Sequence, residues 1–297
     1  MSLRFFVILC LLCGINAGYE EIDLSIIGAV EERPGFWDDK IPELKPHQIV
    51  SRLRSSRIVG GWEVKPHSHP YVVFMLSTYG PSTWRCSGSI ISSTAILTAA
   101  HCPEGSTSSL VVSGVHNVNT IEETQQRRRI PSYDYKIHEN YNPHNLQNDI
   151  AILFIRSYPI TETREVQFVQ LPYDYKKELF VGEMVSIVGW GRTCTLCQSS
   201  SVLRGSENYV IANEECLPYH TLFSDHQMCI RTEGARGACL GDAGGPYTLS
   251  RSGSTDRTAI QIGIHSVIAV GGCEADRPSG AVRLTYFLDW IDSNLKA

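Results

Sequence analysis

Three short stretches of this 297-residue chain contain residue types that could take part in proton transfer. His101 stands in Leu-Thr-Ala-Ala-His-Cys, Asp149 in Asn-Asp-Ile-Ala-Ile-Leu, and Ala243 in Gly-Asp-Ala-Gly-Gly-Pro. An imidazole can accept and return a proton, whereas a methyl group has neither an oxygen that attacks a carbonyl nor a proton for a base to remove. Taken singly, His101 could be a structural histidine and Asp149 an ordinary loop residue.

Taken together and in this order, the stretches resemble the motifs of the trypsin- and chymotrypsin-like serine proteases. That family has Gly-Asp-Ser-Gly-Gly-Pro, so every position of the loop matches except Ala243, where the nucleophilic serine should stand. The resemblance implies that His101 is in the position of the general base and that Asp149 holds its ring. The N–H groups of Gly241 and Ala243 would form the oxyanion hole. Covalent acylation would be lost with the side-chain oxygen.

The stretch Arg-Ile-Val-Gly-Gly at residues 57–61 resembles the activation site of the same family. The resemblance implies that another protease cuts after Arg57 and frees the amino group of Ile58. This ammonium would enter the protein and need a carboxylate partner, because a buried unpaired charge is very costly. Asp242 stands at the family's partner position. The alternative is an exposed basic linker that is not processed.

The residues before this site divide into two segments. A positive start, an apolar stretch and small residues near Ala17 predict a secretory signal peptide over residues 1–17, with a buried N-terminal strand as the alternative. Residues 18–57 contain several prolines, an excess of acidic residues and no cysteine, which predicts a loosely structured pro-segment without a clip domain. The protease-like domain then spans 58–297, and the protein is expected to be secreted and extracellular.

Export implies an oxidising compartment, in which cysteines pair. Of the ten cysteines, two leave with the signal peptide, and the remaining even number is compatible with four disulfides. Cys194 and Cys197 depart from the family pattern and predict a local disulfide on a surface loop, although a Cys-x-x-Cys could also be a redox dithiol or half a zinc site. The pairs that the resemblance implies are Cys86 with Cys102, Cys216 with Cys229, and Cys239 with Cys273.

The protease-like domain has the sequence pattern of a β protein. From residue 58 onward, short runs rich in Val, Ile, Leu and Tyr alternate with Gly, Pro, Ser and Asn, which predicts an all-β architecture of barrels or sandwiches. Apolar residues at helical spacing over residues 285–295 predict a C-terminal helix packed on a barrel. The resemblance implies the chymotrypsin-like fold, with two six-stranded antiparallel β-barrels.

The residues of the expected substrate pocket carry no charge. Gly237 stands where the trypsin-like branch of the family has an Asp that binds basic side chains. Ser266 and Ile268 align with one wall, and Gly280 lies near the other. Since Ile268 replaces a family glycine, we expect a shallow, uncharged pocket, closer to that of elastase than to that of trypsin.

Other features limit the cofactors and partners. Residues 114–125 resemble the family's calcium loop, but only one of the three family carboxylate positions is acidic, so we expect no metal and no cofactor. The basic run at residues 127–129 could bind acidic partners, or it could be a solvated loop face. With a net charge of −5, the chain has no broad basic surface for nucleic acid. It also has no apolar run after the N-terminal segment that is long enough to cross a membrane, so we expect no membrane span.

Three hypotheses about function follow. In the first, the protein is a secreted, catalytically inactive serine protease homologue. It binds extracellular proteins, proteases or their substrates, as a cofactor, decoy or regulator of a proteolytic cascade. In the second, it is a serine endopeptidase of chymotrypsin- or elastase-like specificity, and Ala243 is an introduced or tolerated change. In the third, it is a secretory structural or storage protein.

Overall fold

The computed structural model describes residues 61–220, 223–232, 234, 236–250 and 259–296. The predicted signal peptide, the pro-segment and the activation residues Arg57 and Ile58 lie outside the described residues. In the described part of the chain, no helix is both long and apolar enough to cross a membrane.

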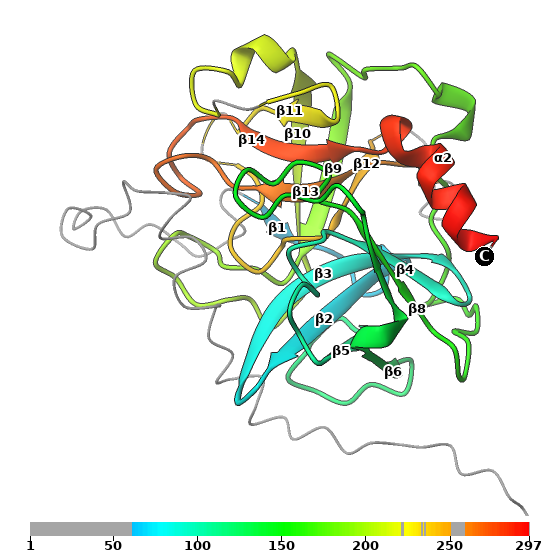
Figure 1. The fold of residues 1–297 in the computed structure, drawn as a ribbon. Coiled ribbons are helices and arrows are strands. Elements are labelled where there is room, and N and C mark those ends of the chain that lie inside the picture. Colours follow the sequence, from blue (N-terminus) through cyan, green and yellow to red (C-terminus); the bar gives the residue numbers. More distant parts are fainter. Residues whose placement is uncertain (1–60, 221–222, 233, 235, 251–258, 297) are drawn as a thin grey trace, which may run out of the picture.

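The described strands form two antiparallel sheets, one from strands β2 to β8 and the other from strands β9 to β14 together with β1 (Figure 1). The strand order is β6-β5-β2-β3-β4-β8-β7 in the first sheet and β1-β10-β11-β14-β13-β12-β9 in the second. The first sheet contains β2 (Val72–Tyr79), β3 (Ser82–Ser92), β4 (Ala95–Thr98), β5 (Ser108–Ser113), β6 (Gln126–Pro131), β7 (Tyr135–Ile137) and β8 (Ala151–Phe154). The second contains β1 (Trp62–Glu63), β9 (Met184–Gly189), β10 (Arg204–Ile211), β11 (Gln227–Ile230), β12 (Pro246–Leu249), β13 (Gln261–Val267) and β14 (Ser279–Arg283).

The second sheet is a closed barrel, and the first is a curled open sheet. In the second, β10 also pairs with β9, so six strands close into a barrel and β1 adds to its side. In the first, β6 and β7 lie at opposite ends of the sheet, although only the 3-10 turn η1 (Ser132–Asp134) separates them in the chain. Pro131 ends β6 without an N–H to donate, and η1 follows at once. The prediction of an all-β chymotrypsin-like fold is therefore confirmed, with one closed barrel where two were expected.

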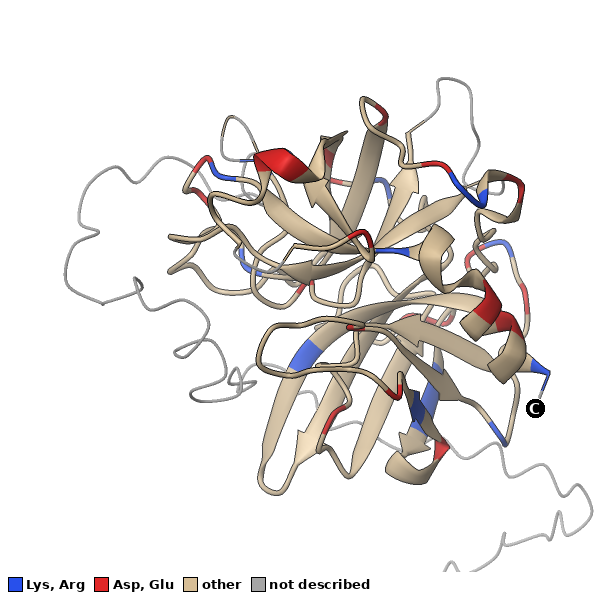
Figure 2. Ribbon diagram, turned by 45° about the horizontal axis from the view of Figure 1, so that its top comes forward, with Lys and Arg blue, Asp and Glu red and all other residues tan. Residues whose placement is uncertain are grey.

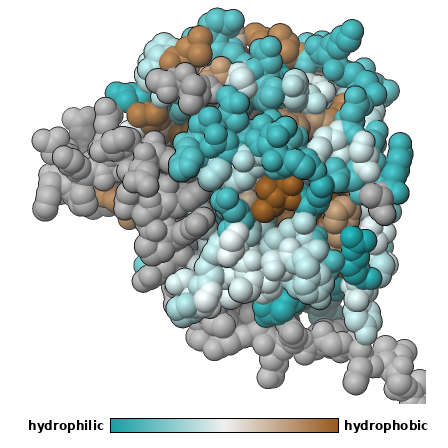
Figure 3. All heavy atoms as spheres, in the orientation of Figure 1, coloured by the Kyte–Doolittle hydropathy of each residue, from teal (hydrophilic) through white to brown (hydrophobic). Residues whose placement is uncertain are grey.

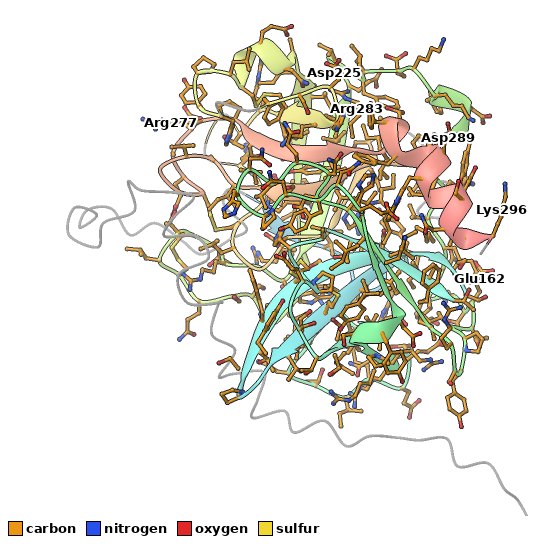
Figure 4. All side chains as sticks on the ribbon, viewed as in Figure 1. Glu162, Asp225, Arg277, Arg283, Asp289 and Lys296 are labelled. Atoms are coloured by element: carbon orange, nitrogen blue, oxygen red, sulfur yellow. A yellow bond between two sulfur atoms is a disulfide. The ribbon has the colours of Figure 1, made fainter. Side chains whose placement is uncertain are left out.

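The C-terminal helix α2 (Leu284–Leu295) packs on the β structure, as the sequence predicts. Its apolar residues Phe287 and Ile291 are buried and join the core of the first sheet. Arg283, just before the helix, is buried; its Nε donates to the Asp225 carbonyl at 3.1 Å and its Nη1 to the Leu179 carbonyl at 2.6 Å (Figure 4). These hydrogen bonds anchor the start of α2 to the closed barrel. Two further 3-10 turns are η2 (Tyr173–Tyr175) and η3 (Asn213–Glu215).

Four disulfides link the described residues, and they are the four predicted pairs: Cys86–Cys102, Cys194–Cys197, Cys216–Cys229 and Cys239–Cys273. Lys, Arg, Asp and Glu are interspersed over both halves of the molecule in the view of Figure 2. The face seen in Figure 3 carries separated hydrophobic spots rather than one broad apolar surface.

Candidate functional site

The residues singled out from the sequence meet where the two sheets face each other. His101 lies in the turn after β4, and Asp149 lies just before β8, so both come from the first sheet. Ala243 lies in the turn before β12 of the closed barrel. The Ser87 N–H of β3 donates to the Ala243 carbonyl at 2.7 Å and ties the two halves together at this point.

His101 and Asp149 form a hydrogen-bonded pair. His101 Nδ1 lies 2.7 Å from Asp149 Oδ2, and the His101 backbone N–H donates to Oδ1 at 2.9 Å. Both side chains are fully buried. Ser266 on β13 donates its hydroxyl to Asp149 Oδ2 at 2.5 Å. Since an ionised carboxylate only accepts hydrogen bonds, Nδ1 carries the ring proton, which leaves Nε2 as the nitrogen that can act as a base.

The Ala243 turn depends on glycine where it passes the first sheet. Gly244 has a φ of +79°, and a Cβ added there would lie 2.1 Å from Thr98 Oγ1 and 2.4 Å from the Ser87 carbonyl. Gly241 has a φ of +94°. In the described part of the chain, the N–H groups of Gly241 and Ala243 take no part in backbone–backbone hydrogen bonds. The turn can therefore present two donors, but the Ala243 methyl adds no reactive atom.

Asp242 is buried directly beside this turn. Its carboxylate accepts the Gly191 N–H at 2.7 Å and the Cys239 N–H at 2.9 Å. A Cβ added at Gly189 would lie 2.2 Å from Asp242 Oδ1, so only glycine leaves room for the carboxylate. Burial raises the pKa of Asp242 to about 6, against the opposing effects of the two backbone donors and of the nearby Arg85 charge. A cation placed here would lower this pKa, as expected for the ammonium of Ile58.

The raised pKa predicts a pH dependence of stability in the uncut protein. The folded state binds the Asp242 proton more tightly than the unfolded chain does, so protonation of Asp242 adds to the free energy of unfolding. This added stability is fully present below about pH 4 and is lost as the pH rises through about 6. The shift from 3.8 to about 6 corresponds to about 3 kcal/mol. In urea unfolding between pH 4 and 7, Asp242→Asn should flatten the pH dependence, whereas Asp289→Asn, whose side chain is 94% exposed, should leave it unchanged. An unaltered slope in Asp242→Asn would contradict the assignment.

The four predicted pocket residues have different surroundings. Ser266 is bonded to Asp149, and Ile268 is buried. A Cβ added at Gly280 would lie 2.9 Å from the Phe223 ring. The nearest atoms around Gly237 belong to Thr232 and Asn208, neither of which is charged. An uncharged pocket remains a prediction, and Ser266 belongs to the network around Asp149 as well as to the wall.

Sequence reasoning missed two buried basic residues at the site. His265, next to Ser266, has a pKa lowered to about 3, first by burial and then by the charge of His101. It is therefore neutral, and within the described residues its Nδ1 makes no hydrogen bond. Its ring meets that of Tyr247 edge-to-face at 6.1 Å. Arg85, next to Cys86, donates from Nη1 to the Trp190 and Ser200 carbonyls at 3.1 and 3.2 Å. Arg85 precedes Cys86 and His265 precedes Ser266, two residues that the sequence analysis singles out, but no family motif includes Arg85 or His265.

The region that resembles a calcium loop is held by protein donors. Glu122 Oε1 accepts the backbone N–H groups of His116 and Asn117 at 3.0 and 2.8 Å, and its Oε2 lies 3.4 Å from His67 Nε2. The neighbouring basic run at residues 127–129 lies on the edge strand β6, not on a loop.

One group of possible metal ligands occurs among the described residues. It consists of Cys86, His101 and Cys102. Since the two cysteines are joined in a disulfide, their sulfurs are not available as thiolate ligands.

A curled sheet and a closed barrel that meet at a His–Asp pair and a glycine-rich turn define the chymotrypsin-like fold of the serine proteases. Residues 58–291 match the Trypsin family model, so the chain belongs to that family. It is similar to Brachyurin of Leptuca pugilator, with 38% identity over 237 residues that cover 80% of this chain and 97% of the relative. Chymotrypsin of Phaedon cochleariae is 31% identical over 243 residues, 81% of this chain and 83% of the relative. A solved structure of HL collagenase has a TM-score of 0.71 at 27% identity and covers 81% of this chain and 99% of its own.

Proposed function

We propose that the protein is a secreted serine protease homologue that binds other proteins at its protease-like site without cutting them. The observation that carries this proposal is Ala243 itself, in the nucleophile position of a site whose His101, Asp149 and Ser266 are hydrogen-bonded together. In enzymes of this mechanism, loss of the nucleophile costs on the order of a millionfold in turnover. What remains, roughly 10³–10⁴-fold over water, is too little for a working protease.

The engagement of nearby hydroxyls also supports the proposal. Thr98, the hydroxyl closest to Gly244, donates to the Ser87 carbonyl at 2.8 Å. Further along the chain, Thr248 Oγ1 bonds to the Tyr71 hydroxyl at 3.2 Å, and Ser250 donates to Glu207 Oε1 at 2.7 Å. Each of these three hydroxyls already takes part in a hydrogen bond, which supports binding rather than cleavage as the role of this site. The partners we propose are extracellular proteases or their substrates.

A matched pair of proteins tests this binding role. The Arg57-cleaved wild type and its Ala243→Ser variant, which differ by one oxygen, are immobilised and exposed to the native extracellular fluid. If a partner occupies the site as a substrate would, the wild type retains it intact and in a stoichiometric amount, and the serine variant releases it cut at a defined bond. If both proteins retain the same intact partner, that partner binds outside the protease-like site. Retention of no stoichiometric partner would favour the storage hypothesis.

A second candidate function is that of a serine endopeptidase of chymotrypsin- or elastase-like specificity. The observation in its favour is that the hydrogen-bonded pair is complete, in a chain 31% identical to a chymotrypsin. It requires that Ala243 stand where the natural protein has serine. Sequencing the native transcript decides this point, because a serine codon at 243 supports the endopeptidase and an alanine codon excludes that origin.

A further inference from the structure

The loop between β9 and β10 packs against the turn that carries Ala243. The Arg192 N–H donates to the Leu240 carbonyl at 2.7 Å. A Cβ added at Gly241 would lie 3.1 Å from the Gly191 Cα, so the two backbones are in close contact. This end of the β9–β10 loop therefore supports the N–H of Gly241, one of the two donors expected in the oxyanion hole.

The other end of the same loop is fixed by Thr195 to a second loop of the site. The Thr195 N–H donates to Glu274 Oε2 at 2.9 Å, and its hydroxyl donates to the same oxygen. The Cys273 N–H donates to Thr195 Oγ1 at 3.0 Å. Gly272, with a φ of +107°, leaves the space that Thr195 fills, since a Cβ there would lie 2.5 Å from Thr195 Oγ1. Thr195 is buried, although it lies in a loop predicted to be at the surface.

The disulfide Cys194–Cys197 closes a short ring around Thr195. Within the ring, the Cys197 N–H donates to the Cys194 carbonyl at 3.1 Å, and Arg192 Nη1 donates to the Thr195 carbonyl at 3.1 Å. Leu196, at the tip, is 66% exposed, so the ring directs one side chain inward and the next one outward. The ring thus restricts the backbone of Thr195 to the conformation in which its hydroxyl reaches Cys273 and Glu274.

A second disulfide, Cys239–Cys273, completes a closed path of contacts. From Leu240 the path runs through Arg192 to Thr195, from Thr195 to Cys273, and through the disulfide back to Cys239, next to Leu240. The disulfide joins the two loops at one point, and the hydrogen bonds of the path restrict how they move about that point. Two hydrogen bonds join the loops in this path, from Arg192 to Leu240 and from Cys273 to the Thr195 hydroxyl, and the second is the one that a side-chain substitution can remove.

We propose that Thr195, held by the Cys194–Cys197 ring, is a positioning residue. It fixes the turn at residues 240–244 and the loop at residues 272–274 relative to each other, and so keeps the Gly241 N–H oriented for a bound carbonyl. The orientation of the carbonyl rests on the proposed function of the site. The rigidity of the two loops does not depend on the proposed function, and it can be measured without a partner.

Amide hydrogen exchange, followed by mass spectrometry on the full-length protein, tests this assignment. Thr195→Val keeps the shape of the side chain and removes the hydroxyl. We expect the amides of Asp242, Gly244 and Cys273 to exchange about tenfold faster or more in this variant. Thr195→Ser, which keeps the hydroxyl, should restore slow exchange. Leu196→Ala, at the exposed tip of the same ring, should match the wild type.

The ring itself is tested by the double variant Cys194→Ala/Cys197→Ala. It should accelerate the same amides, and adding Thr195→Val to it should bring little further change, because both act through one contact. Unchanged exchange over residues 240–244 in Thr195→Val would overturn the proposal, and so would a failure of Thr195→Ser to restore it. An equal effect of Leu196→Ala would also overturn it, since that effect would reflect general loosening of the loop. Amides in β2 report global unfolding and should not change.

Discussion

Replacing Ala243 with serine should raise peptide hydrolysis by the Arg57-cleaved protein on the order of a millionfold, the factor by which loss of this nucleophile lowers turnover. The physical reason is that the other residues of the site are already held by hydrogen bonds. His101 Nδ1 is held 2.7 Å from Asp149 Oδ2, and the Ser87 N–H holds the Ala243 carbonyl at 2.7 Å, so a serine hydroxyl would enter a site of fixed geometry. The measurement is kcat/KM on a peptide library with small and medium apolar side chains at the cleaved position.

Ala243→Gly is the control for this experiment. It changes the same position without adding an oxygen, so its hydrolysis rate should stay at the wild-type level. A folded Ala243→Ser protein that shows no gain over Ala243→Gly would mean that the site differs from an active one by more than one atom. The side-chain preference of the restored activity also tests the pocket, because an uncharged base at Gly237 predicts poor cleavage after Lys or Arg.

In the Ala243→Ser background, Asp149→Asn should lower kcat by about 10⁴-fold, which is the loss known for the equivalent change in the type case of this mechanism. An amide can donate to Nδ1 and stabilise the ring tautomer that cannot accept the serine proton. The His101 backbone N–H would still donate to the amide oxygen at the Oδ1 position, which directs the amide NH2 toward Nδ1. The measurement is kcat for the best library peptide, compared with that of the parent variant.

The control for this prediction is Asp289→Asn, on the exposed surface of α2 (Figure 4). It removes the same charge far from the site and should leave kcat unchanged. A loss of less than tenfold in the Asp149→Asn protein would show that the His101–Asp149 pair does not act in the reaction.

The features that short motifs determine could be predicted from the sequence. His101 and Asp149 can be assigned as a pair, although more than forty residues separate them, because each lies in a stretch typical of the family. The pairing of three disulfides follows from the same resemblance, and that of Cys194 with Cys197 follows from their close spacing together with the expected oxidising compartment. The C-terminal helix can be predicted because apolar residues recur at helical spacing from Phe287 to Leu295.

The features that depend on contacts between distant segments could not be predicted. The first sheet is open, with β6 and β7 at opposite ends on either side of the turn after Pro131, and no local pattern reveals this arrangement. Burial of Arg85 and His265 depends on what the other sheet places over them. The contact of Thr195 with Cys273 joins two loops whose approach no sequence spacing specifies. The role of Arg57 remains a prediction, because it lies outside the described residues.

The most direct test of the central claim is the hydrolysis rate of the purified wild-type protein after cleavage at Arg57, measured with peptide and ester substrates. The account predicts no rate above that of the His101→Ala variant, since without a nucleophile at position 243 the base has no proton to remove. A measurable rate in the wild type that disappears in His101→Ala would contradict it, because such a rate would require a nucleophile that acts through His101.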